Sequence, residues 1–284
     1  MSSMINNTTK CYITNDSNYD NIEETIIIKK KVKKGKKQKS NDSEKKYIKI
    51  LDFEKKTFKI HNKPILKSFY LEDPHIFEIG VDEAGRGPLF GRVYSAAVIL
   101  PKDDSFDHSR VKDSKKFHSK KRIEEVANYI KENAIAWYVS YEDEKSIDDI
   151  NILQATQKAM HTAILNVKKQ LTEKKALSGC QESVHLLIDG NYFKPIYTMN
   201  KYIPYNCIEG GDNKYSSIAA ASILAKVARD DYIDKLCEKN PDLIEKYGID
   251  SNKGYGAKKH IDGIKTHGIT IWHRRTFAPC KDYV

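Results

Sequence analysis

The sequence contains no apolar run that approaches the roughly 20 residues of a membrane-spanning helix, and its N-terminus has no apolar signal-peptide core. Its five cysteines are odd in number and dispersed, and no two of them are close enough in sequence to form a short ligand pair. This pattern is typical of a reducing compartment and does not indicate a zinc site. We therefore expect a soluble intracellular protein, in the cytoplasm, that does not contact membranes.

Acidic residues are missing from one short segment, where the positive charge is concentrated. The formal net charge of the 284 residues is +10, and eight of the eleven residues 29–39 are lysine. Without these eight lysines the net charge is only +2, so the rest of the chain can contact nucleic acid only through a local patch. The lysine tract itself fits three interpretations: a nuclear address, a nucleic-acid tether, or a solubilising tail.

The chain divides by composition into three parts. Residues 1–43 are rich in Asn, Ser, Thr and Lys and show little apolar periodicity, which predicts a disordered basic tail. Residues 44–74 contain two short alternating segments and are interpreted as a linker or a small accessory element such as a hairpin. Residues 75–284 are long enough to form one domain with a sizeable core.

Strand and helix patterns alternate from residue 76 onward. Short apolar runs predict strands at residues 77–82, 93–100, 134–140, 184–188 and 202–208. Apolar residues at helical spacing predict helices at residues 123–130, 150–167 and 217–231. Two consecutive strands followed by alternating strands and helices indicate an α/β domain with a mixed sheet flanked by helices.

Carboxylates stand at the ends of several predicted strands. One strand ends in Asp82 and Glu83, which precede a turn with the sequence Gly85-Arg86-Gly87. Adjacent strand residues point to opposite faces, so the two acids converge only if the strand ends there, and the glycines supply that break. Asp189 and Asp212 also follow predicted strands and adjoin glycine residues.

Four carboxylates held near one another would repel unless cations neutralised them. Two bound divalent metal ions are therefore their natural partner, and an all-oxygen ligand set favours Mg²⁺ or Mn²⁺ over zinc. Two such ions can activate a water molecule and stabilise the leaving oxygen in phosphodiester cleavage. Each aspartate taken alone is as well explained as a turn residue or a helix cap.

The C-terminal segment mixes basic and aromatic residues. Residues 253–277 contain six Lys/Arg, three His and one acid, interleaved with Tyr255, Trp272 and Phe277. This mixture suits contact with phosphates and sugars of nucleic acid, although a solvated basic face would look similar.

With these features the chain resembles the ribonuclease HII family, the type 2 ribonucleases H. The resemblance covers residues 76–280, whose motifs follow the order and spacing of the family. Its motifs are residues 80–88, Asp113-Ser114-Lys115-Lys116, residues 187–191, Gly211-Asp212 with residues 220–230, Lys253-Gly254-Tyr255, and residues 273–277. As a set these motifs are highly specific.

The resemblance implies a ribonuclease H-like fold with a helical C-terminal region that contacts substrate. It implies endonucleolytic cleavage of RNA in RNA–DNA hybrids and at ribonucleotides in duplex DNA, in DNA replication and repair, leaving 5′-phosphate and 3′-hydroxyl ends. Four residues are implied to be catalytic and to bind two Mg²⁺ or Mn²⁺ ions: Asp82, Glu83, Asp189 and Asp212. Eight are implied to bind substrate: Gly85, Arg86, Gly87, Lys115, Lys226, Tyr255, Arg274 and Arg275.

Among these eight, Gly85-Arg86-Gly87 and Tyr255 are expected to read the ribonucleotide at an RNA–DNA junction. Close backbone approach and a tyrosine hydroxyl can both address the 2′-OH group, which distinguishes RNA from DNA.

The sequence departs from the family pattern in two places, and two alternative functions are also considered. Phe90 and Arg92 replace smaller residues after the glycine-rich turn, and residues 1–74 have no counterpart in the minimal pattern. A catalytically silent hybrid-binding protein would gain nothing from four clustered acids that face phosphate. A catalytic subunit that is active only in a hetero-complex is equally consistent with the sequence, although we expect a monomer.

Overall fold

The computed structural model describes residues 66–284, except for residue 113, residues 115–116, residue 118, residues 176–182 and residues 199–200. The chain divides into two units, Met1–Lys63 and Pro64–Val284, and all described residues belong to the second. The predicted tail at residues 1–43 and most of the predicted linker therefore lie outside the described residues and remain predictions.

A five-stranded mixed sheet forms the centre of the domain, as predicted. Its order is β3-β2-β1-β4-β7, in which β1 is antiparallel to β2 and parallel to β4, and β7 is parallel to β4. The strands are β1 (Ile76–Ala84), β2 (Val93–Ile99), β3 (Ala136–Glu142), β4 (Ser183–Asp189) and β7 (Tyr205–Ile208). Two further strands, β5 (Tyr197–Thr198) and β6 (Lys201–Tyr202), pair separately with each other.

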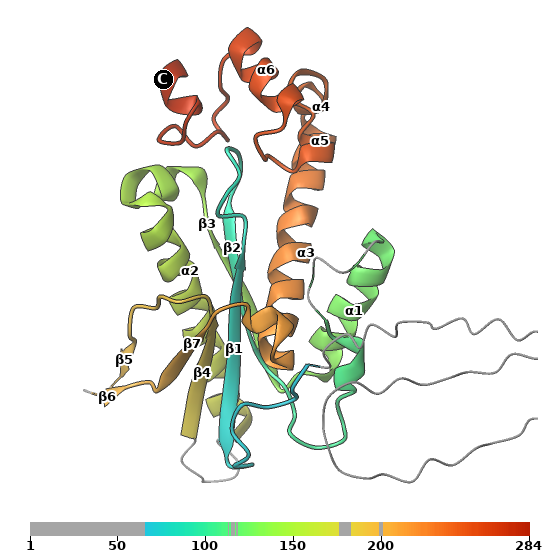
Figure 1. Ribbon diagram of the computed structural model, residues 1–284, viewed down its shortest axis with the longest axis vertical. Coiled ribbons are helices and arrows are strands. Elements are labelled where there is room, and N and C mark those ends of the chain that lie inside the picture. The colour runs from blue at the N-terminus through green and yellow to red at the C-terminus, as the bar shows by residue number, and fades with distance from the viewer. Residues whose placement is uncertain (1–65, 113, 115–116, 118, 176–182, 199–200) are drawn as a thin grey trace, which may run out of the picture. The chain divides into compact units, whose positions relative to one another are not determined.

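Helices cover both faces of the sheet (Figure 1). One face packs against α1 (Lys120–Asn133) and α3 (Ser216–Lys239), and the other packs against α2 (Glu144–Lys175). Alternation along β2 explains the two cores, because successive strand residues point to opposite faces. Ala96 and Val98 contribute to the core under α1 and α3, whereas Ala97 and Ile99 contribute to the core under α2.

A small helical layer follows α3 at the end of the chain, as the sequence predicts. It contains α4 (Asp242–Tyr247), α5 (Ile249–Asn252) and α6 (Lys258–His267). Short 3-10 helices lie elsewhere, namely η1 (His108–Arg110), η3 (Gly211–Asn213) and η4 (Cys280–Tyr283). None of the helices within the described part of the chain is both long enough and apolar enough to cross a membrane.

The two residues that depart from the family pattern both have structural partners. The Phe90 ring is fully buried in the core of the helical layer and contacts Trp272 and His273 edge-on or tilted. The Arg92 guanidinium lies between the rings of Tyr141 and Tyr232, with its carbon 4.1 and 4.3 Å from the two ring centroids. These contacts are cation–π interactions in a partly buried setting.

Residues 66–74, which the sequence assigns to the linker, contact the domain. The Lys67 N–H donates to the Lys214 carbonyl at 2.8 Å, and the Ser216 N–H donates to the Lys67 carbonyl at 3.0 Å. The buried Glu78 carboxylate accepts the N–H groups of Tyr70 and Leu71. The packed domain therefore includes residues that precede position 75.

One predicted strand is interrupted. The apolar pattern at residues 202–208 predicts a continuous strand, but the structure has β6 ending at Tyr202 and β7 beginning at Tyr205. Pro204 lies in the gap, where it has no N–H to donate to a strand ladder. Its carbonyl still accepts the Leu186 N–H at 2.9 Å.

The backbone of α3 lies directly against the sheet at Gly80 in β1. A Cβ atom on Gly80 would lie 2.2 Å from the Ser217 carbonyl carbon and 2.5 Å from the Ile218 nitrogen, so that backbone meets backbone there. Since neither backbone can move aside without shifting the helix, we expect Gly80→Ala to lower the free energy of unfolding by roughly 1–3 kcal/mol. Urea unfolding of both proteins measures this difference.

Gly256→Ala is the matched control, because its Cβ would lie 3.6 Å from the nearest side-chain atoms. Its stability should stay within about 0.5 kcal/mol of the wild type. Equal stability of Gly80→Ala and the wild type would contradict the close helix–sheet contact.

Candidate active site

Two carboxylates are brought side by side by the parallel pairing of β1 and β4. Val81 lies opposite Ile188 in this ladder, so Asp82 and Asp189, each one residue further along, reach the same end of the sheet. Asp82 is only 4% exposed. Glu83 follows Asp82 in β1, and both Glu83 and Asp189 interact electrostatically with Asp82.

The fourth predicted acid reaches the same end of the sheet through a tight turn. Gly210 has a left-handed conformation (φ 61°) and starts η3, and the Gly211 N–H donates to Asp189 Oδ1 at 2.6 Å. A Cβ on Gly211 would lie 2.5 Å from the Ile218 Cδ1 atom, so any larger residue there would displace that side chain. Asp212 follows directly and is buried, with the Asn213 side-chain amide donating to its Oδ1 at 3.0 Å.

Burial and mutual repulsion dominate the electrostatics of the cluster. The pKa of Asp82 is raised well above its usual value, first by burial and then by the charges of Glu83 and Asp189. A hydrogen bond from Ser222 opposes this rise. Burial also raises the pKa of Glu83, although the Arg86 guanidinium, 3.3 Å from Glu83 Oε1, lowers it. The site thus brings several carboxylates together, with the Arg86 guanidinium paired to Glu83.

The oxygen atoms of these carboxylates are the type of ligand that a hard cation prefers, but the side chains are not arranged around a common point. Within the described residues, no group of three or more His, Cys, Asp or Glu side chains is arranged so that it could hold a metal ion. Asp82 and Asp189 each accept a backbone N–H at 2.6 Å, and Glu83 pairs with Arg86. All the predicted donors are oxygens, as Mg²⁺ and Mn²⁺ prefer, and a cation would relieve the repulsion that raises the pKa of Asp82.

The Gly85-Arg86-Gly87 turn is held from beneath by a buried arginine. Arg274 is fully buried, and its guanidinium donates four hydrogen bonds to backbone carbonyls of this turn and the residues after it. The acceptors are Gly85, Arg86, Pro88 and Gly91, at 2.6, 2.9, 2.8 and 2.9 Å. Burial lowers the pKa of Arg274 to about 9, so the group stays charged at neutral pH. Its location supports a positioning role in place of the predicted substrate contact.

Tyr255 lies beside this turn. A Cβ on Gly87 would be 3.6 Å from the Tyr255 ring, which is itself half exposed. The buried Arg229 contacts the segment that carries Tyr255. Its guanidinium carbon Cζ lies 5.8 Å from the centroid of the Tyr255 ring, and its Nη2 donates to the Lys253 carbonyl at 2.8 Å. A Cβ on Gly85 would collide with Arg229 Nε at 2.3 Å. The sequence motif contains Arg229 but gives no signal of this role.

The other predicted substrate contacts have different positions. Lys226 in α3 forms an ion pair with Asp230 at 2.9 Å and lines a hollow of about 210 Å³ between α1 and α3. Arg275 is exposed, and its backbone N–H donates to Asp148 at 2.9 Å. Lys115 lies outside the described residues. Of these three residues, the structure thus describes Lys226 in the hollow beside α1 and Arg275 on the surface.

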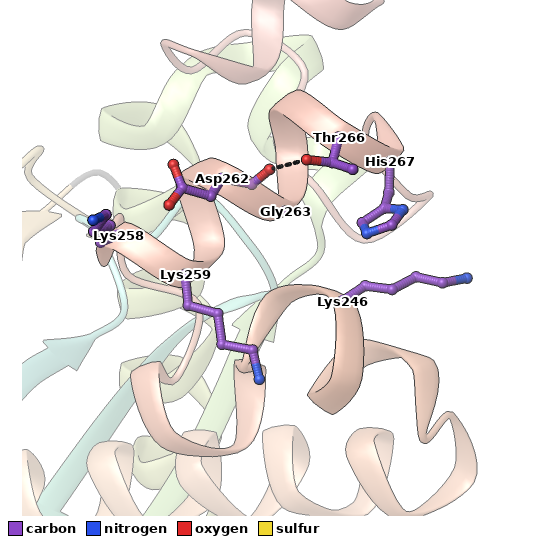
Figure 2. A pocket seen from close by; sticks show the side chains of 7 residues that line it. All are labelled: Lys246, Lys258, Lys259, Asp262, Gly263, Thr266 and His267. Carbon is purple, nitrogen blue, oxygen red and sulfur yellow. Dashed lines mark hydrogen bonds between the residues drawn. The ribbon is translucent and has the colours of Figure 1, made fainter.

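A basic groove lies in the helical layer, within the predicted segment 253–277 and its neighbour α4. Its volume is about 570 Å³, and Figure 2 shows its lining side chains on α4 and α6. The lining residues are Lys246, Lys258, Lys259, Asp262, Gly263, Thr266 and His267. The groove is separate from the carboxylates but begins three residues after Tyr255, and its surplus of lysine suits a phosphate backbone.

Two buried histidines lie between α6 and the C-terminal segment. His260 and His273 are 0% and 1% exposed, and their Nε2 atoms are 3.0 Å apart. Burial lowers the pKa of both rings, that of His273 to about 3, where His260 adds to the effect. Nothing in the sequence singles out His260, because a lone histidine in a basic segment carries no pattern.

Comparison with known proteins identifies the family. Residues 79–280 match the family model described as ribonuclease HII. The chain belongs to the ribonuclease HII family. A ribonuclease HII of Parabacteroides distasonis is 46% identical over 209 residues, which cover 74% of this chain and 93% of the relative. A ribonuclease HII of Neisseria gonorrhoeae is 41% identical over 208 residues, with coverages of 73% and 95%.

Solved structures confirm the ribonuclease H-like fold. Ribonuclease H2 from Pyrococcus horikoshii superimposes with a TM-score of 0.55 at 22% identity, covering 73% of this chain and 96% of that one. Bst-RNase HIII, solved in complex with Mn²⁺, gives a TM-score of 0.55 at 19% identity, with coverages of 74% and 69%. As a member of the ribonuclease HII family, which acts on RNA–DNA substrates, the chain is an endoribonuclease, a hydrolase with ribonuclease H activity.

The buried histidines predict a pH dependence of stability for this enzyme. Below the ordinary histidine pKa of 6.5, the unfolded chain binds a proton at His273, whereas the folded ring stays neutral until about pH 3. Lowering the pH through this window therefore favours the unfolded state. Relative to His273→Asn, the wild type should lose about 2 kcal/mol of unfolding free energy between pH 7 and pH 5.

Denaturant titrations of both proteins at the two pH values measure this change. Subtracting the variant removes the contributions of the carboxylates, which titrate in both proteins. An unchanged difference between pH 7 and pH 5 would mean that His273 is protonated in the folded protein.

Proposed function

We propose that this chain hydrolyses the RNA strand of RNA–DNA hybrids and also cleaves at single ribonucleotides embedded in duplex DNA. Cleavage would use two divalent metal ions, Mg²⁺ or Mn²⁺, and leave 5′-phosphate and 3′-hydroxyl ends. The observation that carries the proposal is the buried Asp82, crowded by Glu83 and Asp189 at a strand end that opens beside a glycine turn and a half-exposed tyrosine.

The carboxylates in this proposal are the residues that hold the metal ions: Asp82, Glu83, Asp189 and Asp212. When bound, such ions activate water and stabilise the leaving oxygen of a phosphodiester. Asp82 and Asp189 are kept in place by backbone N–H donors, and Ser222 adds a hydrogen bond to Asp82. Arg86 pairs with Glu83 in the structure. When substrate enters, the Arg86 guanidinium would instead bind a phosphate group.

Recognition of the ribonucleotide is proposed for Gly85-Arg86-Gly87 and Tyr255. The absence of a side chain at Gly87 leaves room for a sugar beside the Tyr255 ring, and a tyrosine hydroxyl can bond to a 2′-OH. The basic groove of α4 and α6 would contact the phosphate backbone of the flanking duplex. Lys115, Lys226 and Arg275 remain proposed substrate contacts, and the active form is proposed to be a cytoplasmic monomer.

A catalytic subunit of a hetero-complex is the second candidate. A ribonuclease HII of Archaeoglobus fulgidus has been solved in complex with PCNA, which shows that this relative binds a protein partner. Gel filtration of the purified chain, with activity measured across the eluted fractions, separates the two candidates. Activity that appears only after a partner is added would favour the complex.

The carboxylates should be essential for turnover and dispensable for binding. We expect Asp82→Asn and Asp189→Asn each to lower turnover by orders of magnitude, because each removes a proposed metal ligand and no phosphate contact. The measurements are cleavage of a duplex with one embedded ribonucleotide in Mg²⁺ or Mn²⁺, and hybrid binding by the same proteins. Glu173→Gln on the exposed face of α2 is the control and should cleave like the wild type.

Substantial metal-dependent turnover by Asp82→Asn would rule out the proposed mechanism. Loss of hybrid binding together with turnover would instead show that the substitution damages the fold.

Tyr255 should matter more for one ribonucleotide than for a long hybrid, where many registers are productive. On the single-ribonucleotide substrate, Tyr255→Phe should cost roughly 0.5–1.5 kcal/mol in transition-state stabilisation, as expected for one hydrogen bond. Tyr255→Ala should cost about 1–3 kcal/mol more through lost stacking. Values of kcat/KM for both substrates at matched salt test this, and equal losses on the two substrates would make Tyr255 a structural residue.

A further inference from the structure

The peptide that carries Tyr255 is held by bonds to its backbone. Tyr255 lies in the short connection between α5 and α6, and the carbonyl before it, that of Gly254, accepts the Leu89 N–H at 2.8 Å. The carbonyl of Tyr255 itself accepts two bonds, from the Ala257 N–H at 2.8 Å and from His260 Nδ1 at 2.8 Å. The second of these bonds ties the peptide of the tyrosine to a side chain five residues further along the chain.

His260 is the middle member of a chain of hydrogen bonds. Its Nε2 lies 3.0 Å from His273 Nε2, and His273 Nδ1 lies 2.9 Å from both the backbone nitrogen and the hydroxyl of Thr270. The chain thus runs from Thr270 through two imidazoles to the carbonyl of Tyr255. Both rings are fully buried, so no bond in it is exchanged readily for a bond to water.

Only one arrangement of protons satisfies every atom of this chain. The Thr270 N–H can only donate, so His273 Nδ1 is an acceptor and the proton of that neutral ring is on Nε2. His273 Nε2 then donates to His260 Nε2, which leaves the proton of His260 on Nδ1. That proton is donated to the Tyr255 carbonyl, which can only accept. The direction of the whole chain is fixed by a backbone amide at one end and a backbone carbonyl at the other.

Aromatic rings enclose the two imidazoles. Phe90 lies 5.1 Å from His273 and 6.3 Å from His260, and Tyr247 lies 5.1 and 6.1 Å from the same rings, measured between ring centroids. Phe90 lies between Pro88 and Gly91, whose carbonyls both accept from the Arg274 guanidinium, so the packing around the histidine pair is continuous with the glycine turn. This packing restricts the imidazoles to the ring planes that the hydrogen bonds need.

We propose that His260 and His273 are positioning residues that set the preference of this enzyme for a ribonucleotide at a junction. The pair holds the carbonyl of Tyr255 and thereby places the tyrosine ring beside Gly87. The inference rests on the proposed role of Tyr255 as the residue that reads the ribose. Neither histidine touches substrate, and both act through the peptide of Tyr255.

The measured quantity is the junction ratio, defined as kcat/KM on a duplex with one ribonucleotide divided by kcat/KM on a long hybrid. His260→Leu removes the side-chain donor to the Tyr255 carbonyl and leaves that of the Ala257 N–H, so it should lower the ratio about three- to tenfold, as expected for one lost hydrogen bond. His260→Asn keeps an amide donor on the Nδ1 side and should hold the ratio closer to that of the wild type. In a Tyr255→Ala background, His260→Leu should not lower the ratio further, since the residue it positions is gone.

Ile264→Ala is the matched control, because Ile264 is a fully buried residue of the same helix outside the hydrogen-bond chain. It should reduce stability and leave the ratio unchanged. If His260→Leu folds poorly, His273→Asn gives the same comparison, because it keeps an acceptor for Thr270 and removes the donor to His260. Equal losses on both substrates in the histidine variants, as in Ile264→Ala, would overturn the inference.

Amide hydrogen exchange of residues 253–257 separates this inference from the proposed function. Faster exchange in His260→Leu but not in Ile264→Ala, together with a lowered ratio, supports the inference. Faster exchange with an unchanged ratio, and an unchanged ratio in Tyr255→Ala, would show that the pair holds the tyrosine but that the tyrosine does not read the ribose. Unchanged exchange would show that the pair does not position Tyr255, whatever that residue does.

Discussion

The contact between α3 and β1 at Gly80 is the constraint on which the rest of the site depends. Because no side chain separates the two backbones there, the helix lies directly on the strand, and residues further along both elements stay next to each other. Ser217 lies at Gly80, Ser222 bonds to Asp82, and Arg229 packs against Gly85. Twelve helical residues at about 1.5 Å each span nearly the same distance as five strand residues at about 3.3 Å, so the register is kept along the whole strand.

This shared register explains why one helix serves both halves of the site. The early part of α3 supports the carboxylates through Ser222, and its later part supports the glycine turn through Arg229. Further along, Ile233 contributes to the core of the helical layer that carries Tyr255. A single rigid helix thus sets the distance between the carboxylates and the residue proposed to read the ribose, and sites built on rigid elements hold their geometry precisely.

The sequence allowed the fold class and the position of the acids to be predicted, because those signals are local. Apolar runs that end in Asp82 or Asp189 report a strand and its end within a few residues, and the structure confirms the mixed sheet. The roles of Arg274 and His260 could not be predicted. Arg274 reads as a surface cation beside Arg275, and only the partners about 185 residues away show that it is buried. Long-range partners of this kind leave no periodic pattern in one sequence.

Arg274 has a consequence for the outer side of the glycine turn. A peptide group is planar and trans, so a carbonyl that points toward the guanidinium directs the next N–H the opposite way. The carbonyls of Gly85 and Arg86 both point inward, which leaves the N–H groups of Arg86 and Gly87 pointing outward. Successive outward amides form a concave surface of partial positive charge that attracts anionic oxygens. A cation buried under the turn therefore makes its exposed peptide dipoles a surface for phosphate, although the turn lies beside a cluster of acids.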